Sequence, residues 1–367
     1  MPIEQNLGNQ MISDGRATDS GTVAAVDMFC GVGGLTYGLQ SAGIKVAAGY
    51  DIDPKGRYPY EANCRSSFVE ADIRDVKVDE VRDHFGNRPV RVLAGCAPCQ
   101  PFSTYSQSKR TKDDQWRLLS EFQRLALGLR PEILTVENVR GLQDHQVWKN
   151  FLATLVENGY HFDAAILRCE EFGIPQTRRR LVLIASRLGP IKVPRPRLLT
   201  EQRTVRDAIA HLPKIEAGGV DPSDPLHQSS RVSSLNMQRL RASRPGGTWR
   251  DWPDELRSGC HARKTGETYP SVYGRMEWDS PSPTITTQFY GFGNGRFGHP
   301  SQDRAISIRE AALLQSFPEK YDFVAPTERI TFRNVGVLVG NAVPPRLGEA
   351  IGHAIMEHVQ SSGGGVL

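Results

Sequence analysis

The feature that most restricts the fold is a repeating order of short apolar runs, each followed by a loop that carries glycine or a polar side chain. Thr22–Phe29 reads as a buried strand, a glycine loop follows it, and Leu35–Ser41 reads as a helix. A second strand-like run, Lys45–Tyr50, ends at Asp51. Because alternating strands and helices favour a mostly parallel sheet, we expect an α/β fold.

The rest of the chain repeats this order. We expect further strands over Ser67–Ala71, Val90–Ala94, Glu132–Val136, Ala164–Arg168 and Leu181–Ala185, the last two as a hairpin, and helices over Trp116–Leu129, Thr204–His211, Ile306–Phe317 and Arg346–Val359. Four chemically active side chains stand just past strand ends: Asp51, Asp72, Cys99 and Glu137. Ligands of open α/β sheets bind in the crevice at that edge, so we expect one shared site.

The loop Cys30–Gly34 favours a nucleotide-like ligand. Its glycines let the backbone approach a ligand, and the following helix offers free N–H groups to negative charge. Asp51 follows Gly31 by 20 residues, a spacing that places a carboxylate near the hydroxyls of a ribose. NAD-dependent enzymes and S-adenosylmethionine-dependent enzymes both show this pattern, so the loop alone does not choose between them.

Cys99 lies in a loop rich in glycine and proline, Gly95–Ser103. Pro98 restricts the backbone beside the thiol, which suits a nucleophile that must be aimed. Cys96 and Cys99 also form a C-x-x-C pair, which half of a zinc site or a redox pair would share. The sequence holds no second C-x-x-C to complete a zinc site, so we expect no metal.

Length and charge suggest two domains and a nucleic-acid partner. The chain has 367 residues, and residues 187–326 carry 20 Lys and Arg against 15 Asp and Glu. Such arginines form either a solvated surface or a face toward phosphates. We expect a disordered tail at 1–21, a catalytic domain at 22–187 plus 327–367, and a smaller domain with its hinge at 188–326. No apolar run is long enough for a membrane span, and no signal peptide is visible.

In chain order, the motifs resemble those of the cytosine-C5 DNA methyltransferases, mainly of bacterial type, over about residues 24–345. The matching stretches are Asp27–Gly34, Asp51–Asp53, Ala71–Ile73, Pro98–Gln100, Glu137–Val139, Gln176–Arg180, Arg309–Ala312 with Gln315 and Phe317–Pro318, and Gly340–Val343. The resemblance implies a Rossmann-like, S-adenosylmethionine-dependent methyltransferase sheet with a second, smaller target recognition domain.

The resemblance also implies roles for single residues. Cys99 would be the nucleophile that adds to cytosine C6, Glu137 would handle the proton at N3, and Arg180 would help to hold the base. The residues implied to bind S-adenosylmethionine are Phe29, Gly31, Val32, Gly33, Gly34, Leu35, Asp51, Ile52, Asp72, Ile73, Pro98, Asn341 and Val343. Those implied to contact DNA are Gln100, Ser103, Arg178 and Thr284. Cys96 stands where the family often has glycine, and we assign it no chemistry.

Double-stranded DNA is the implied substrate, with the target cytosine flipped out of the helix. We further expect a cytoplasmic monomer, in keeping with six scattered cysteines and a reducing compartment. The sequence leaves open the recognised DNA site and whether a separate cognate restriction endonuclease exists. Three other functions are weighed: a dinucleotide-dependent oxidoreductase, a tRNA cytosine-C5 methyltransferase of the same family, and a DNA-binding regulator without catalysis. Pro98–Gln100 and Glu137–Val139 argue against the first and third, and the sizeable second domain favours DNA over tRNA.

Overall fold

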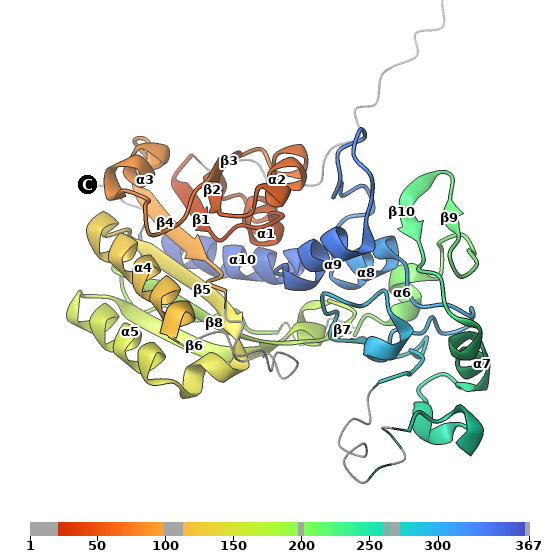
Figure 1. The fold of residues 1–367 in the computed structure, drawn as a ribbon. Coiled ribbons are helices and arrows are strands. Elements are labelled where there is room, and N and C mark those ends of the chain that lie inside the picture. The colour runs from red at the N-terminus through yellow and green to blue at the C-terminus, as the bar shows by residue number, and fades with distance from the viewer. Residues whose placement is uncertain are drawn as a thin grey trace, which may run out of the picture.

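The computed structural model describes residues 21–98, 113–196, 202–259, 261, 263 and 272–363, without the side chains of 113–117. A seven-stranded sheet with helices on both faces forms one part of the molecule, and a second part of short helices and loops lies beside it (Figure 1). This arrangement confirms the expected α/β fold. The tail that we expect to be disordered lies outside the described residues, apart from Gly21.

The sheet contains β1 (Val23–Met28), β2 (Lys45–Asp51), β3 (Ser67–Glu70), β4 (Val90–Gly95), β5 (Ile133–Val139), β6 (His161–Arg168) and β8 (Arg179–Ser186). Their spatial order is β3-β2-β1-β4-β5-β8-β6. β8 is antiparallel to both of its neighbours, and the other adjacent strands are parallel. The expected hairpin of the last two strands is therefore confirmed.

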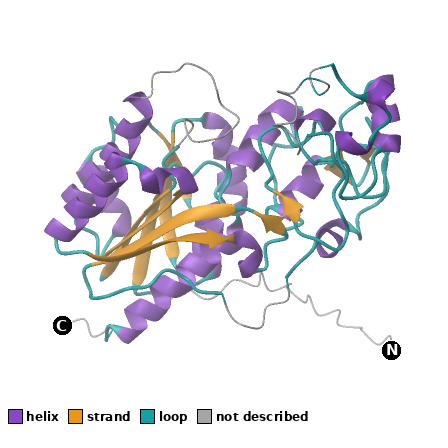
Figure 2. Cartoon of the chain, turned by 90° about the horizontal axis from the view of Figure 1, so that it is seen from below, coloured by secondary structure: helices purple, strands orange, loops and turns teal. Residues whose placement is uncertain are grey.

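The core lies on both faces of the sheet. β1 is buried at every position, as expected for a parallel strand between two layers of helices. One face is covered by α3 (Val78–Phe85), α4 (Asp113–Leu129) and α5 (Gln146–Glu157), and the other by α1 (Gly34–Ser41) and α10 (Pro345–Ser361) (Figure 2). α2 (Arg57–Asn63) packs beside β3.

Glycines set the close packing of α1 against α10. A Cβ added at Gly34 would lie 2.1 Å from the carbonyl oxygen of Val343, and one at Gly38 would lie 2.3 Å from that of Pro345. Since both neighbours are backbone atoms, a larger residue would force the helices apart. The two helices run in the same direction, so their N-terminal ends lie together at the carboxyl edge of the sheet.

The second part contains α6 (Val205–Ile209), β9 (Val220–Asp221), β10 (Asp224–Gln228), α7 (Ser234–Ala242) and β11 (Ser282–Pro283), followed by α8 (Ile308–Leu314) and α9 (Phe332–Asn341). One apolar cluster joins α6, β10, α8 and α9. Val335 and Val339 of α9 belong to it, although residues 327–367 are expected in the catalytic domain. The domain boundaries therefore stay a prediction. Within the described residues, no helix has the length and hydropathy needed to cross a lipid bilayer.

Candidate active site

Strand register brings two chain segments together at the carboxyl edge of the sheet. Met28 of β1 pairs with Gly95 of β4, and Gly95 pairs with Val136 of β5. Cys96, just after β4, and Glu137 of β5 are the next residues along the two strands. They therefore lie at the same level of the sheet edge. The strand order reverses between β1 and β4, and such a reversal opens the crevice in which α/β proteins bind ligands.

Glu137 is buried at this edge, with 2% of its surface exposed. Arg180 forms an ion pair with it, with 2.8 Å between Nε and Oε1. The arginine reaches the carboxylate because β8 pairs with β5 so that Arg180 stands opposite Val139, diagonal to Glu137 on the same face. The structure thus brings together the carboxylate and the arginine to which the sequence assigns catalytic roles.

Cys96 is a third member of this group, which the sequence analysis missed. Its Sγ donates a hydrogen bond to Oε2 of Glu137 at 2.8 Å. Burial and the neighbouring carboxylate raise the pKa of Cys96 well above the usual thiol value, so the group stays protonated and acts as a donor. Its position two residues past the expected strand Val90–Ala94 was visible in the sequence, but its partner follows only from strand pairing.

The expected nucleophile Cys99 lies outside the described residues, as do Gln100 and Ser103. The chain that leads to them is fixed by Asn138, whose buried side chain donates to the carbonyl oxygen of Ala97 at 2.9 Å. The strand that carries Glu137 therefore also anchors the start of the segment that continues to Cys99.

The glycine loop after β1 has the backbone that its sequence predicts. Gly31 and Gly33 have φ of 51° and 88°, and Phe29 has φ of 61°, a conformation that is rare for a non-glycine residue. Asp51 holds the loop, because its Oδ2 accepts from the N–H of Gly31 at 2.9 Å and its Oδ1 accepts from the N–H of Asp53 at 2.9 Å. Burial raises the pKa of Asp51.

The surface beside this loop offers an apolar face. Ile52 is 63% exposed, which is unusual for isoleucine, and it directly follows Asp51. A Cβ added at Gly31 would meet no atom within 4 Å, so the space on that side of the loop is open. Pro98 and Asn341 are also exposed.

Other residues expected to bind the cofactor are differently placed. The side chains of Val32, Leu35, Ile73 and Val343 belong to apolar clusters, so only their main chains can reach a ligand. Gly34 faces the Val343 carbonyl. Similarly, the carboxylate of Asp72 is already held by Arg74, whose hydrogen bonds lower its pKa.

Arg178, which is expected to contact DNA, is placed differently in the structure, because its charge is buried inside the protein and does not face the surface. Its side chain is 2% exposed, and its guanidinium donates to the carbonyl oxygens of Ile285, Gly340 and Ala342 at 3.1 to 3.4 Å. The physical reason is the alternation of side chains along an extended segment. Residues 176 and 178 point into the protein, and 177 and 179 point outward.

The same segment joins the two parts of the molecule. β7 (Gln176–Thr177) pairs in parallel with β11. Gln176 accepts from the N–H of Ile285 and donates to the carbonyl of Leu314. Thr284, expected to contact DNA, donates its hydroxyl to the carbonyl of Thr177 at 2.8 Å. Its role toward DNA stays a prediction.

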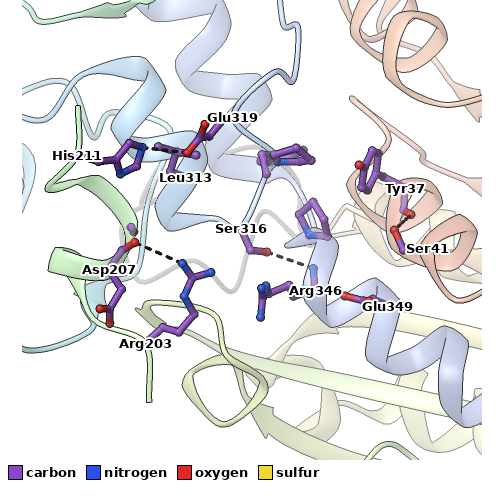
Figure 3. A pocket seen from close by; sticks show the side chains of 14 residues that line it. Tyr37, Ser41, Arg203, Asp207, His211, Leu313, Ser316, Glu319, Arg346 and Glu349 are labelled. Atoms are coloured by element: carbon purple, nitrogen blue, oxygen red, sulfur yellow. Dashed lines mark hydrogen bonds and ion pairs between the residues drawn. The ribbon is translucent and has the colours of Figure 1, made fainter. Parts of the chain in front are cut away.

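A cavity of about 320 Å³ lies at the junction of the two parts, with walls from α1, α6, α10 and the loop after α8 (Figure 3). Two of its basic side chains have partners within the protein. His211 lies 3.0 Å from Glu319, and Arg203 donates to the carbonyl of Asp207 at 3.3 Å. Burial, with some repulsion from Arg203, lowers the pKa of Arg346. Glu137 does not line this cavity, which lies at the joint of the two parts.

Comparison with known proteins tests the resemblance. The type II methylase M.HgiDII of Herpetosiphon aurantiacus is 48% identical over 341 residues, covering 92% of this chain and 96% of the relative. The type II methyltransferase M1.HphI of Haemophilus parahaemolyticus is 34% identical, covering 90% and 86%. The crystal structure of the S. pombe Dnmt2 methyltransferase has the same fold, with a TM-score of 0.65 at 16% identity, over 92% of this chain and 98% of that one.

The model of the C-5 cytosine-specific DNA methylase family matches residues 23–357. This span includes both the glycine loop and the Glu137 edge, and it runs through the second part to α10. The chain therefore belongs to the C-5 cytosine-specific DNA methylases, as its motifs predicted.

Proposed function

We propose that the protein transfers a methyl group from S-adenosylmethionine to C5 of a flipped-out cytosine in a specific duplex DNA sequence. We further propose that it is the modification enzyme of a restriction-modification system. The family supports the reaction, and the names of the type II relatives support the biological setting. The observation that carries the proposal is the buried Glu137 between Arg180 and Cys96, at the edge from which the chain leads to Cys99.

The residues around the glycine loop fit the proposed cofactor. Ile52 offers an exposed apolar face to a purine, and the space beside Gly31 is open. Each oxygen of Asp51 accepts one backbone hydrogen bond and keeps a lone pair for a ribose hydroxyl. Asp72 can likewise accept from an adenine amino group while Arg74 holds it. When bound, S-adenosylmethionine supplies an electrophilic methyl group.

The chemistry explains why a cysteine and a carboxylic acid are needed. Cytosine C5 is too weak a nucleophile to take up a methyl group directly. Addition of the Cys99 thiolate to C6 forms a C–S bond and shifts electrons toward C5 and N3. Only roughly 3% of a free thiol with a pKa near 8.5 is ionised at pH 7, so the site must favour this step.

Glu137 is placed to limit charge on the ring during that addition. As electrons move toward N3, a proton shared by the carboxyl group neutralises the charge that would otherwise build up there. Arg180 holds the carboxyl group from the side of β8. After C5 has become methylated, a base removes the C5 proton and the C–S bond breaks, which returns the Cys99 thiolate. We assign the C5 proton to water.

We propose that residues 22–187 and 327–367 form the catalytic domain and that 188–326 form the target recognition domain with its hinge. Its arginine excess contributes affinity through phosphates, and sequence is read by its side chains and loops. Gln100, Ser103 and Thr284 are proposed to contact DNA near the flipped base. We propose a cytoplasmic monomer that acts separately from any cognate endonuclease.

The test is duplex DNA that carries 5-fluorocytosine at the target position, which methylation sequencing of DNA from expressing cells first identifies. Fluorine cannot leave as F⁺, so we expect a covalent protein–DNA adduct that survives denaturing electrophoresis. It should require S-adenosylmethionine and vanish in Cys99→Ala. An absent adduct at the mapped target would contradict the mechanism. Methyl acceptance by tRNA in place of DNA would contradict the substrate.

A further inference from the structure

Cys96 contacts the carboxyl group on which the proposed reaction depends, although the proposed nucleophile is a different cysteine. The two oxygens of Glu137 have different surroundings. Oε2 accepts the thiol hydrogen bond at 2.8 Å. Oε1 lies 2.8 Å from Nε of Arg180, but the N–H direction there does not meet hydrogen-bond geometry. Oε1 is therefore buried and accepts no hydrogen bond from the described residues.

We propose that Cys96 is a positioning residue, whose thiol occupies Oε2 of Glu137 and so presents Oε1 to N3 of the flipped cytosine. This inference rests on the proposed function. Oε1 has the charge contact with Arg180 but no hydrogen bond, and a buried acceptor without a hydrogen bond is costly, so we explain it by a hydrogen-bond partner that arrives with the substrate. The terminal torsion of a glutamate is broad, and a single contact would leave the carboxyl plane free to turn. Contacts at both oxygens hold it.

The remaining charged and titratable groups near Glu137 do not supply this donor. Arg178, between β7 and β8, donates from its guanidinium to carbonyl oxygens of the protein. Asp27 on β1 accepts from the hydroxyl of Thr36. Cys169, in the short helix Cys169–Phe172, is buried in an apolar cluster and has no hydrogen bond from its thiol to Glu137. Among the described residues, Cys96 is thus the neutral donor on the carboxyl group.

The experiment measures methyl transfer in a single turnover, as a function of pH, in the full-length protein. For Cys96→Ala we expect a rate about 10- to 100-fold lower, because small errors in the placement of a reacting group are costly. Loss of a donor also disfavours the carboxylate relative to the acid, so the alkaline limb of the profile should move to higher pH. Cys96→Ser keeps a hydrogen-bond donor and should restore both the rate and the pH profile. Cys169→Ala, which removes another buried thiol, should change neither.

An infrared S–H stretching band gives a readout that does not depend on turnover. The difference between wild type and Cys96→Ala should contain a hydrogen-bonded S–H band, and Glu137→Gln should shift it toward a weaker bond. A wild-type rate and profile in Cys96→Ala would overturn the proposal. The proposal would also be overturned if the rate of Cys96→Ala fell only in proportion to a loss of stability, with an unshifted pH profile and no recovery of the rate in Cys96→Ser. If the wild type itself transfers no methyl group, the proposed function fails, and the position of the band still decides whether the contact exists.

Discussion

Replacing Arg178 with methionine should destabilise the protein without removing a DNA contact. Its guanidinium is buried and donates to three carbonyl oxygens that belong to the second part and to the end of α9. Methionine fills most of the volume of the arginine stem but donates no hydrogen bond. The three acceptors would then be left buried without this donor, and the segment after β7 would lose its link to Gly340 and Ala342.

The size of the effect follows from the contacts. A hydrogen bond from a charged donor contributes about 1.5 to 3 kcal/mol, so three acceptors represent roughly 5 to 9 kcal/mol. Removing the buried charge recovers several kcal/mol of desolvation free energy. We therefore expect the free energy of unfolding to fall by about 3 to 5 kcal/mol. Arg179→Met is the matched control, because its side chain is exposed, and we expect a change within about 0.5 kcal/mol.

Two assays separate a structural arginine from one that contacts DNA. Urea denaturation gives the loss of stability. The salt dependence of DNA binding counts phosphate contacts, and loss of one contact lowers the slope of log K against log[salt] by about 1. Arg178→Met should lose stability and keep the slope. A variant that keeps wild-type stability but shows the smaller slope would refute the buried assignment.

Three further predictions concern the carboxyl edge of the sheet and the helices α1 and α10 that cover one of its faces. Burial raises the pKa of Asp27 from 3.8 to about 7, so its contribution to stability is present below pH about 4 and is lost as the pH rises through about 7. The stability of Asp27→Asn relative to wild type, measured by urea denaturation, should accordingly rise by about 2 kcal/mol from about pH 5.5 to about pH 8.5, and a constant difference would contradict this. Asp51→Ala should weaken S-adenosylmethionine binding in calorimetry, whereas an unchanged dissociation constant would remove Asp51 from the cofactor site. Gly38→Ala should lower the melting temperature by several degrees, since its Cβ would meet backbone atoms of α10 at 2.3 Å, and a wild-type melting curve would show that the helices can separate freely.

Local sequence determined the elements of the sheet. β1 differs from the expected strand Thr22–Phe29 by one residue at each end, and the last two strands form the expected hairpin. Strands buried on both faces appear as continuous apolar runs, so neighbouring residues alone reveal them. The ends of other elements were less exact: β5 continues to Val139, so Glu137 lies within the strand and not past its end as expected. α8 begins at Ile308 because Ser307 and Glu310 form a capping box, a signal that the sequence contained.

The motifs also determined which family to expect, and they placed Glu137 and Arg180 in one site. They could not show which way each arginine of the segment points. Arg178 and Arg180 lie on the same side of an extended chain, yet one meets carbonyl oxygens at the joint and the other meets Glu137. The direction depends on what packs against each position, and those partners lie about 100 or more residues away for Arg178 and 43 residues away for Arg180.

Only the tertiary structure gave Cys96 its partner. The sequence shows a cysteine one residue past β4 and a carboxylate within β5, 41 residues apart. Whether two such groups meet depends on register, because a shift of one residue turns each side chain to the opposite face of the sheet. The pairing of Gly95 with Val136 places Cys96 beside Glu137. Residue order thus determined the strands and the chemistry available at their ends, and the alignment of the strands determined which of those groups touch.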